Sequence, residues 1–212
     1  MVEICRLAGF YKIPWVKNLG VVVESFLNSF VLVFLSEMGD KTQLLALVLA
    51  ARYRKPFVVM AGILVATLLN HFLAAWLGSW STHFLDSEAL RWVLGFLFLG
   101  FAAWILIPDK ESDLRSFFRW GPFVTTLVSF FIAEMGDKTQ LATIALGARY
   151  KEIFWVTLGT TAGMLGSNAI AVFLGDRLLK RIPMKWVRLS ASLIFALFGL
   201  ALLWGVVIKK TG

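Results

Sequence analysis

The sequence predicts an all-α polytopic membrane protein, with six transmembrane helices arranged as two inverted three-helix repeats. Three observations predict this. Hydrophobic residues make up 59% of the 212 residues and charged residues only 16%, with a mean hydropathy of +0.79. In a soluble domain, about a quarter of the residues are charged. The apolar residues gather into six runs long enough to cross a bilayer, and a polar motif in the first run recurs in the fourth.

The first half of the chain contains three of these runs. Residues 1–20 mix basic and apolar side chains around Pro14, which interrupts any helix there, and we expect an interfacial segment. The first repeat is expected at 21–107, with segments at 21–51, 57–80 and 90–107. The 31 residues of the first segment would span roughly 46 Å as one helix, against a bilayer core of about 30 Å. This segment must therefore tilt, extend beyond the core or break, and Gly39 is the natural point for a break.

The second half repeats the pattern. Residues 108–120 are the most hydrophilic stretch of the chain, and we expect a loop that joins the two halves. The second repeat is expected at 121–208, with segments at 122–148, 153–175 and 186–208 and a tail at 209–212. Pro122 suits the first turn of the fourth segment.

An offset of 97 residues aligns the two halves. It carries Glu37 onto Glu134, and 12 of 18 positions match between residues 36–53 and 133–150 without a gap. Because each half has an odd number of spans, the second half enters the membrane from the opposite side. Such an inverted repeat places related residues near the midplane, around a pseudo-twofold axis. The alternative is a parallel duplication, which requires one miscounted span.

The net charge of +8 is explained by the ends of the apolar runs, where Lys and Arg gather. We interpret these residues as headgroup contacts and topology signals, and we expect no nucleic-acid partner. With the N-terminus outside, cytoplasmic loops hold 11 Lys and Arg residues and the opposite faces hold 8, which favours an N-out, C-out topology. The single cysteine, Cys5, excludes an intrachain disulfide and a cysteine-based metal cluster.

The repeated motif places two carboxylates and an ammonium at membrane depth, where ionisable groups usually mark a transport pathway or a relay. If a copy is helical, Glu37, Asp40 and Lys41 share roughly one face. We expect the two copies to face each other and to form one cation site. Its residues are Glu37, Gly39, Asp40, Lys41, Thr42 and Gln43 in the first copy, and Glu134, Gly136, Asp137, Lys138, Thr139 and Gln140 in the second.

The charges of the two copies indicate an exchanger. Four carboxylates and two ammoniums sum to −2 when all are ionised. One divalent cation would neutralise the cluster, and so would two protons. Because burying net charge is costly, such a site can alternate between the two loads. Oxygen ligands suit Ca²⁺, Mn²⁺ and Mg²⁺, and we expect no further cofactor.

Several neighbouring residues have two possible roles. Met38 and Met135 add thioethers that either ligate the ion, which would favour Mn²⁺ over Ca²⁺, or pack against lipid and helices. Asn70, His71 and Asn168 either line the path or form interhelical hydrogen bonds.

The remaining motif residues are also open to alternatives. The threonine and glutamine of each copy either ligate or cap a broken helix. Lys41 and Lys138 are either counter-charges that hold Asp40 and Asp137, or they snorkel to an interface. A purely structural reading would have Glu–Lys pairs within each half. A divalent cation channel would use the same acidic ring, and an intramembrane enzyme could use paired acids, although no nucleophile–base set accompanies them.

The duplicated Glu-x-Gly-Asp-Lys-Thr, in the first helix of each three-helix half, resembles the GDT family of cation/proton exchangers from about Val21 onward. The resemblance implies a secondary active transporter that exports Mn²⁺ or Ca²⁺ from the cytoplasm in exchange for protons. Glu37, Asp40, Glu134 and Asp137 would carry the metal and the protons. The short N-terminus and compact central loop resemble those of family members in the bacterial plasma membrane, so we expect a multi-pass protein of that membrane. In a bacterium, Mn²⁺ is the favoured cargo. The oligomeric state is open, with a homodimer as one alternative.

Overall fold

The computed structural model describes residues 14–84, 87–107, 120–175 and 184–211. These residues form helices and no strand, which confirms the all-α class. Five helices are long and apolar enough to cross a membrane, as expected for a polytopic membrane protein. Three stretches lie outside the described residues: residues 108–119 of the predicted central loop, residues 1–13 of the predicted interfacial segment, and the last residue of the tail.

The first half forms α2 (Pro14–Glu37), α3 (Lys41–Tyr53), α4 (Pro56–Ser81) and α5 (Ser87–Ile105). α2 begins at Pro14, so the first helix starts before residue 21, where the first repeat was expected to begin. A proline is well tolerated there, since its missing N–H would have no partner within the helix. Residues 14–20 therefore continue the first helix. α3 is followed by Arg54, which is left-handed at φ 52°, and α4 begins at Pro56.

The second half forms the same series. It consists of α6 (Pro122–Glu134), α7 (Lys138–Tyr150), α8 (Ile153–Ala169) with its π-helical continuation η3 (Ile170–Leu174), and α10 (Met184–Thr211). α6 begins at Pro122, and α7 is followed by Lys151, which is left-handed at φ 59°. The first and fourth apolar runs of the sequence are therefore each divided into two helices at the motif.

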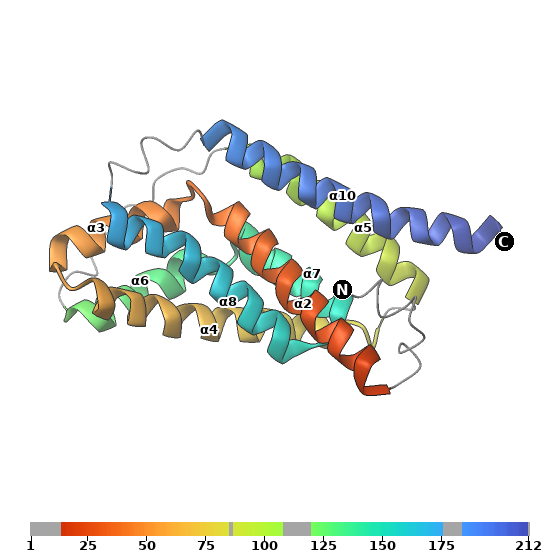
Figure 1. Cartoon of the computed structure of the whole chain (residues 1–212), viewed down its shortest axis with the longest axis horizontal. Coiled ribbons are helices and arrows are strands. Elements are labelled where there is room, and N and C mark those ends of the chain that lie inside the picture. The colour runs from red at the N-terminus through yellow and green to blue at the C-terminus, as the bar shows by residue number, and fades with distance from the viewer. Residues whose placement is uncertain (1–13, 85–86, 108–119, 176–183, 212) are drawn as a thin grey trace.

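The helices of the two halves are interleaved. α2 packs against α8, and α4 packs against both α6 and α7. α5 and α10 pack on each other along one side of the molecule (Figure 1). Phe98 and Phe195 are fully buried between these two helices. The broken helices thus lie among α4 and α8, and α5 and α10 form a separate pair beside them.

Two close helix crossings are related by the 97-residue offset. Where α4 crosses α6, a Cβ added at Gly62 would lie 2.7 Å from Thr126 Cβ. Where α2 crosses α8, a Cβ added at Gly159 would lie 3.0 Å from Ser29 Cβ. Both crossings need glycine, because any side chain would push the helices apart. The residue pairs at the two crossings differ by 97 in both members.

The two broken helices run in opposite directions. Asn28 Nδ2, in α2, donates a hydrogen bond to the hydroxyl of Tyr150, the last residue of α7, at 2.7 Å. The hydroxyl of Tyr53, the last residue of α3, donates to Thr125 Oγ1 in α6 at 3.1 Å. Each broken helix therefore ends beside the first half-helix of the other.

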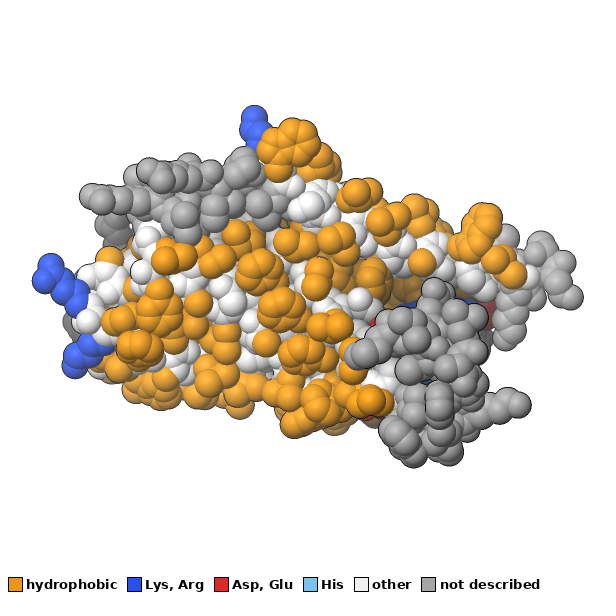
Figure 2. Space-filling model, viewed as in Figure 1, with side chains coloured by type: hydrophobic (Ala, Val, Ile, Leu, Met, Phe, Trp, Pro, Cys, Tyr) orange, Lys and Arg blue, Asp and Glu red, His pale blue; other side chains and the backbone are white. Residues whose placement is uncertain are grey.

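The surface is strongly apolar. Figure 2 shows hydrophobic side chains spread over most of the visible face, with the Lys and Arg side chains at its edges. A large apolar surface of this kind is expected where lipid replaces water. Large exposed apolar residues include Phe72, Trp76, Phe96, Leu193, Leu197 and Trp204.

Candidate functional site

The first copy of the motif breaks the helix between α2 and α3. α2 ends at Glu37 and α3 begins at Lys41. Gly39 has φ 77°, a left-handed conformation that glycine adopts without strain. Asp40 is extended, at φ −83° and ψ 167°, and lies at the N-cap of α3. The predicted break at Gly39 is confirmed, whereas the helical arrangement that would put Glu37, Asp40 and Lys41 on one face is wrong.

The second copy has nearly the same backbone. α6 ends at Glu134, and α7 begins at Lys138. Gly136 has φ 75°, and Asp137 is extended at φ −81° and ψ 165°. Neither Asp40 nor Asp137 caps its own helix with its side chain. The positive ends of the α3 and α7 helix dipoles nevertheless lie beside these carboxylates and favour their negative charge.

Two hydrogen bonds brace each break from within. The threonine hydroxyl donates to Oε2 of the glutamate, and the glycine N–H donates to Oε1 of the glutamine. The bonds are Thr42–Glu37 (2.7 Å) and Gly39–Gln43 (2.8 Å) in the first copy, and Thr139–Glu134 (3.0 Å) and Gly136–Gln140 (2.7 Å) in the second. In this conformation the threonines and glutamines hold the shape of the break and position the glutamates.

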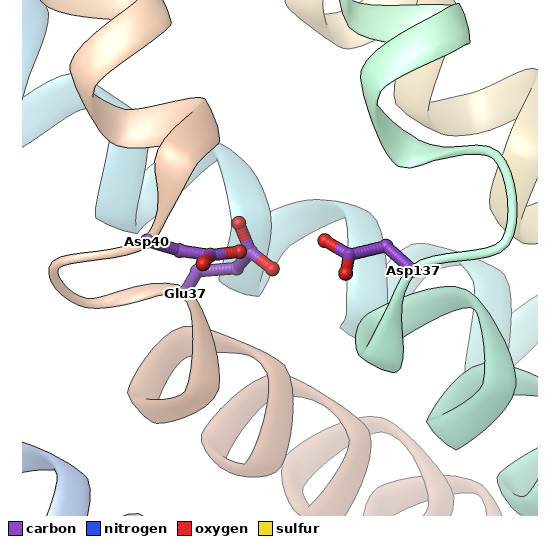
Figure 3. Close-up of side chains that lie close together, drawn as sticks. All are labelled: Glu37, Asp40 and Asp137. Carbon is purple, nitrogen blue, oxygen red and sulfur yellow. The ribbon is translucent and has the colours of Figure 1, made fainter. Parts of the chain in front are cut away.

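Three of the four predicted acids come together. Glu37, Asp40 and Asp137 are buried, and each offers a carboxylate oxygen within 4.8 Å of the others. Figure 3 shows Glu37 and Asp40 beside the first break, with Asp137 facing them from the second. Glu134 is fully buried as well but lies outside this group of three. The two copies thus contribute to one cluster of oxygen donors, a set that suits a hard divalent cation.

The two lysines cross between the copies. Lys41 Nζ lies 3.3 Å from Asp137 Oδ2, and Lys138 Nζ lies 3.2 Å from Asp40 Oδ1. Among the described residues, both of these ion pairs join one copy to the other. Each lysine balances the aspartate of the other half. Oε1 of Glu37, in contrast, is buried without a hydrogen-bond partner among the described residues.

The two methionines differ in their surroundings. Met38 is buried, and its sulfur lies 3.8 Å from Gln43 Nε2. Met135, the matching residue of the second copy, is 60% exposed. Only Met38 lies inside the protein beside the motif, so the two thioethers do not form a matched pair of ligands in this conformation.

The polar residues of the second and fifth segments, Asn70, His71 and Asn168, are buried, and both asparagines donate hydrogen bonds to backbone carbonyls. Asn70 Nδ2 donates to the Phe131 carbonyl at 3.1 Å and so joins α4 to α6. Asn168 Nδ2 donates to the Met164 carbonyl at 3.0 Å within α8. His71 is fully buried, and neither ring nitrogen has a hydrogen-bond partner in the described part of the chain. Asn70 thus forms the kind of interhelical hydrogen bond that was the alternative to path lining.

Sequence reasoning did not single out several residues that contact the motif helices. Gln43 Nε2 donates to Ser167 at both the carbonyl (2.8 Å) and the hydroxyl (3.2 Å), so it joins α3 to α8. Tyr53 and Tyr150 join each broken helix to the other. The two tyrosines carried a signal, because the sequence identity of the repeats extends to the Ala-Arg-Tyr that contains them. For Ser167 the only signal was its place next to Asn168.

Comparisons with known proteins identify relatives of the chain. A family model described as "Divalent cation/proton antiporter GDT1" matches residues 25–113 and 122–209. A Vibrio cholerae protein named "Putative manganese exporter" is 48% identical over 80% of this chain and 85% of its own length. "GDT1-like protein 5" of Arabidopsis thaliana is 29% identical over 86% and 96%, and "Divalent cation/proton antiporter GDT1" of Saccharomyces cerevisiae is 30% identical over 44% and 33%. No solved structure matches the chain.

Proposed function

The chain belongs to the GDT1 family of divalent cation/proton antiporters, and we propose that it exports Mn²⁺ in exchange for protons by alternating access. The family and the relatives make the chain a divalent cation transporter rather than an enzyme. The proposal concerns the cargo, the mechanism and the residues that bind the ion. These residues are Glu37, Asp40, Glu134 and Asp137.

The observation that carries the proposal is the buried cluster formed by both copies. Glu37, Asp40 and Asp137 meet there, and two lysines neutralise the two aspartates. The charge that remains belongs to Glu37 and Glu134, both fully buried. Two buried carboxylates are neutralised either by one divalent cation or by two protons. Exchange of these two loads leaves the net charge of the site unchanged, which is what an electroneutral antiporter requires.

Alternating access is supported by the relation between the two halves. Each broken helix ends beside the start of the other, through the Tyr150–Asn28 and Tyr53–Thr125 contacts. The crossings at Gly62 and Gly159 are related by the same offset as the motifs. Both features are expected of inverted repeats, in which broken helices meet at a site near the midplane and one half rocks against the other. We therefore retain six spans in two inverted repeats as part of the proposal.

Mn²⁺ is favoured over Ca²⁺ as cargo for two reasons. The relative of 48% identity carries manganese in its name. In addition, the buried Met38 sulfur lies beside the motif, and a thioether is a soft ligand that suits a transition metal better than Ca²⁺. The similarity to a bacterial protein also supports a multi-pass location in a bacterial inner membrane, for which the distribution of basic residues favours an N-out topology.

Transport in proteoliposomes tests the coupling. We expect an imposed pH gradient to drive Mn²⁺ uptake, and a pH-sensitive dye to report protons moving the opposite way. Glu37→Gln keeps the shape of the side chain and its bond with Thr42 but removes the charge, so it should abolish exchange. Mn²⁺ flux that is indifferent to the pH gradient would contradict the antiport. Current without proton counter-flow would indicate a channel instead.

Cargo preference has a matched pair of variants. Met38→Leu and Met135→Leu make the same chemical change, at a buried and an exposed position. In competition between Mn²⁺ and Ca²⁺, we expect Met38→Leu to lower the preference for Mn²⁺ and Met135→Leu to leave it unchanged. If the two variants had equal effects, or no effect, the Met38 thioether would not contribute to the preference for Mn²⁺.

A further inference from the structure

The two tyrosines that end the broken helices occupy equivalent positions at opposite ends of the site. Tyr150 accepts a hydrogen bond from Asn28 at 2.7 Å, and its hydroxyl lies 3.5 Å from Glu24 Oε1, one helical turn earlier on α2. Tyr53 donates to Thr125 Oγ1 at 3.1 Å and lies 3.3 Å from the Trp120 carbonyl. The 97-residue offset carries Tyr53 onto Tyr150 and Asn28 onto Thr125. Each contact joins the end of one half's broken helix to the first half-helix of the other half's broken helix.

Buried hydroxyls lie between the Tyr150 contact and the cluster of acids. Along α2, Ser29 follows Asn28 in the direction of Glu37, and its side chain is fully buried at the crossing with α8. Thr157 and Thr161 flank this crossing on α8. The hydroxyls of Ser29, Thr157 and Thr161 have no hydrogen-bond partner among the described residues. Such groups are well suited to receive water once the crossing loosens.

The other crossing has a similar, smaller set. Thr126 of α6 meets Gly62 of α4, and Ser129 follows one turn nearer to Glu134. On α4, Thr67 lies between Gly62 and the α6-bonded Asn70, and its buried hydroxyl lacks a hydrogen-bond partner in the described ranges. A polar seam thus leads from each tyrosine toward the acids, through α2 and α8 on one side and through α4 and α6 on the other.

We propose that Tyr150 and Tyr53 are the two gates of the transport path, and that each closes one hydroxyl-lined seam by holding the two halves together at its own face of the membrane. Both contacts are formed in this structure, so both seams are closed. Opening on one face requires release of that tyrosine while the other remains bonded. This inference rests on the proposed alternating access and adds to it the residues that decide which face is open.

The two gates are chemically unequal. Tyr150 has the exposed carboxylate of Glu24 beside it, whereas the described contacts of Tyr53 are the Thr125 hydroxyl and a backbone carbonyl. A carboxylate at the mouth of a seam attracts divalent cations, which a hydroxyl and a carbonyl do much less. In the proposed N-out topology the Tyr150 end lies at the outer face, so the Glu24 carboxylate stands where the exported metal leaves.

Thiol accessibility tests the gates independently of transport. With Cys5→Ser removing the only native cysteine, Ser29→Cys and Thr126→Cys place equivalent reporters in the two seams. A membrane-impermeant maleimide is then added from one face at a time. Tyr150→Phe should speed labelling of the Ser29 reporter about three- to tenfold, the effect of losing one hydrogen bond, and leave the Thr126 reporter unchanged. Tyr53→Phe should do the reverse, from the opposite face.

Ser192→Ala is the matched control. It also deletes one interhelical hydroxyl bond, from Ser192 to the Ala102 carbonyl at 2.7 Å, but between α10 and α5. We expect it to change neither reporter. If each tyrosine variant speeded the labelling of both reporters equally, or if neither variant speeded the labelling of either reporter, the proposal that the tyrosines are gates would be disproved. Labelling needs no transported metal. The labelling rates therefore test the gates separately from the measurement of proton-coupled Mn²⁺ transport in the wild type.

Discussion

The crossed ion pairs allow the sharpest quantitative prediction. Asp40 and Lys138 lie 3.2 Å apart, with side chains only 1% and 6% exposed. Two unit charges at this distance attract by roughly 5 kcal/mol at an effective dielectric constant of about 20. Removal of one partner of a buried pair typically costs about 3–5 kcal/mol, because the other charge loses its compensation. We therefore expect Asp40→Asn and Lys138→Met each to destabilise the protein strongly, and the double variant to cost much less than their sum.

The assay is a double-mutant cycle on the free energy of unfolding, measured by titration with a denaturing detergent in mixed micelles. We expect a coupling energy of about 3 kcal/mol between Asp40 and Lys138. The matched cycle uses Asp137→Asn and Lys41→Met. The Lys41 side chain is 21% exposed, and an exposed ammonium at membrane depth usually meets a water-filled cavity, which screens it. The second coupling should accordingly be smaller, about 1–2 kcal/mol.

Two outcomes would contradict this reasoning. Additive effects in the Asp40–Lys138 cycle would mean that the pair does not form in the folded protein. A larger coupling for Lys41 than for Lys138 would mean that enclosure by protein does not decide the strength of these pairs. Either result would also weaken the charge argument, which assigns the residual charge of the site to Glu37 and Glu134.

Three further predictions concern the breaks and the exchange. Gly39→Ala should lower the thermal stability and the transport rate, because φ 77° costs a non-glycine residue about 1–2 kcal/mol, whereas Gly20→Ala, with nothing within 4 Å of the added Cβ, should do neither. Thr42→Val should raise the KM for Mn²⁺ about fivefold by freeing Glu37. Thr139→Val should raise the KM less, because Glu134 lies beside the group of three carboxylates rather than within it in this conformation, and uptake kinetics measure both values. Lowering the pH on the metal-loading side should raise the KM for Mn²⁺, by up to about 100-fold per pH unit when two protons compete with one ion, and initial rates at varied pH measure this slope.

Much of the architecture was predictable from local pattern. Apolar runs of membrane length, prolines at helix starts and a glycine inside a polar cluster have direct physical consequences for the backbone. The break at Gly39 follows from them, since a 31-residue run exceeds one span and glycine adopts the left-handed conformation without strain. The meeting of the two motifs was likewise expected from their repetition on opposite halves.

The partners of the lysines were not predictable in the same way. Spacing along one helix identifies neighbours three or four residues away, and it suggested that Lys41 belongs with Glu37 and Asp40. The break removes that face, so the choice of partner passes to tertiary structure, and Lys41 meets Asp137. No periodicity within either copy contains this information.

The different burial of the two copies could not be predicted from the sequence, for another reason. Met38 and Met135 sit in nearly identical local sequences, yet one is buried and the other is 60% exposed. The difference comes from what packs against each break. Gln43 reaches Ser167 on α8, just before this helix widens into the π-helical turn η3, whereas the corresponding α4 stays a regular α-helix. Such π-helical turns often lie at functional sites, and here the turn follows the α8 residue that is contacted by Gln43, the neighbour of the buried Met38.

The bonds of the site divide into two kinds with different consequences for movement. The Thr–Glu and Gly–Gln bonds close within each copy, so they survive any displacement of one half against the other, whereas the Gln43–Ser167 bonds join the halves. The pairs Lys41–Asp137 and Lys138–Asp40 join the copies, so a movement that separated the halves would break two buried ion pairs at once. That cost is high at membrane depth. A rotation about an axis through the site keeps both pairs while it loosens one seam and tightens the other. The crossed lysines therefore favour rocking around a fixed site over opening of the site itself.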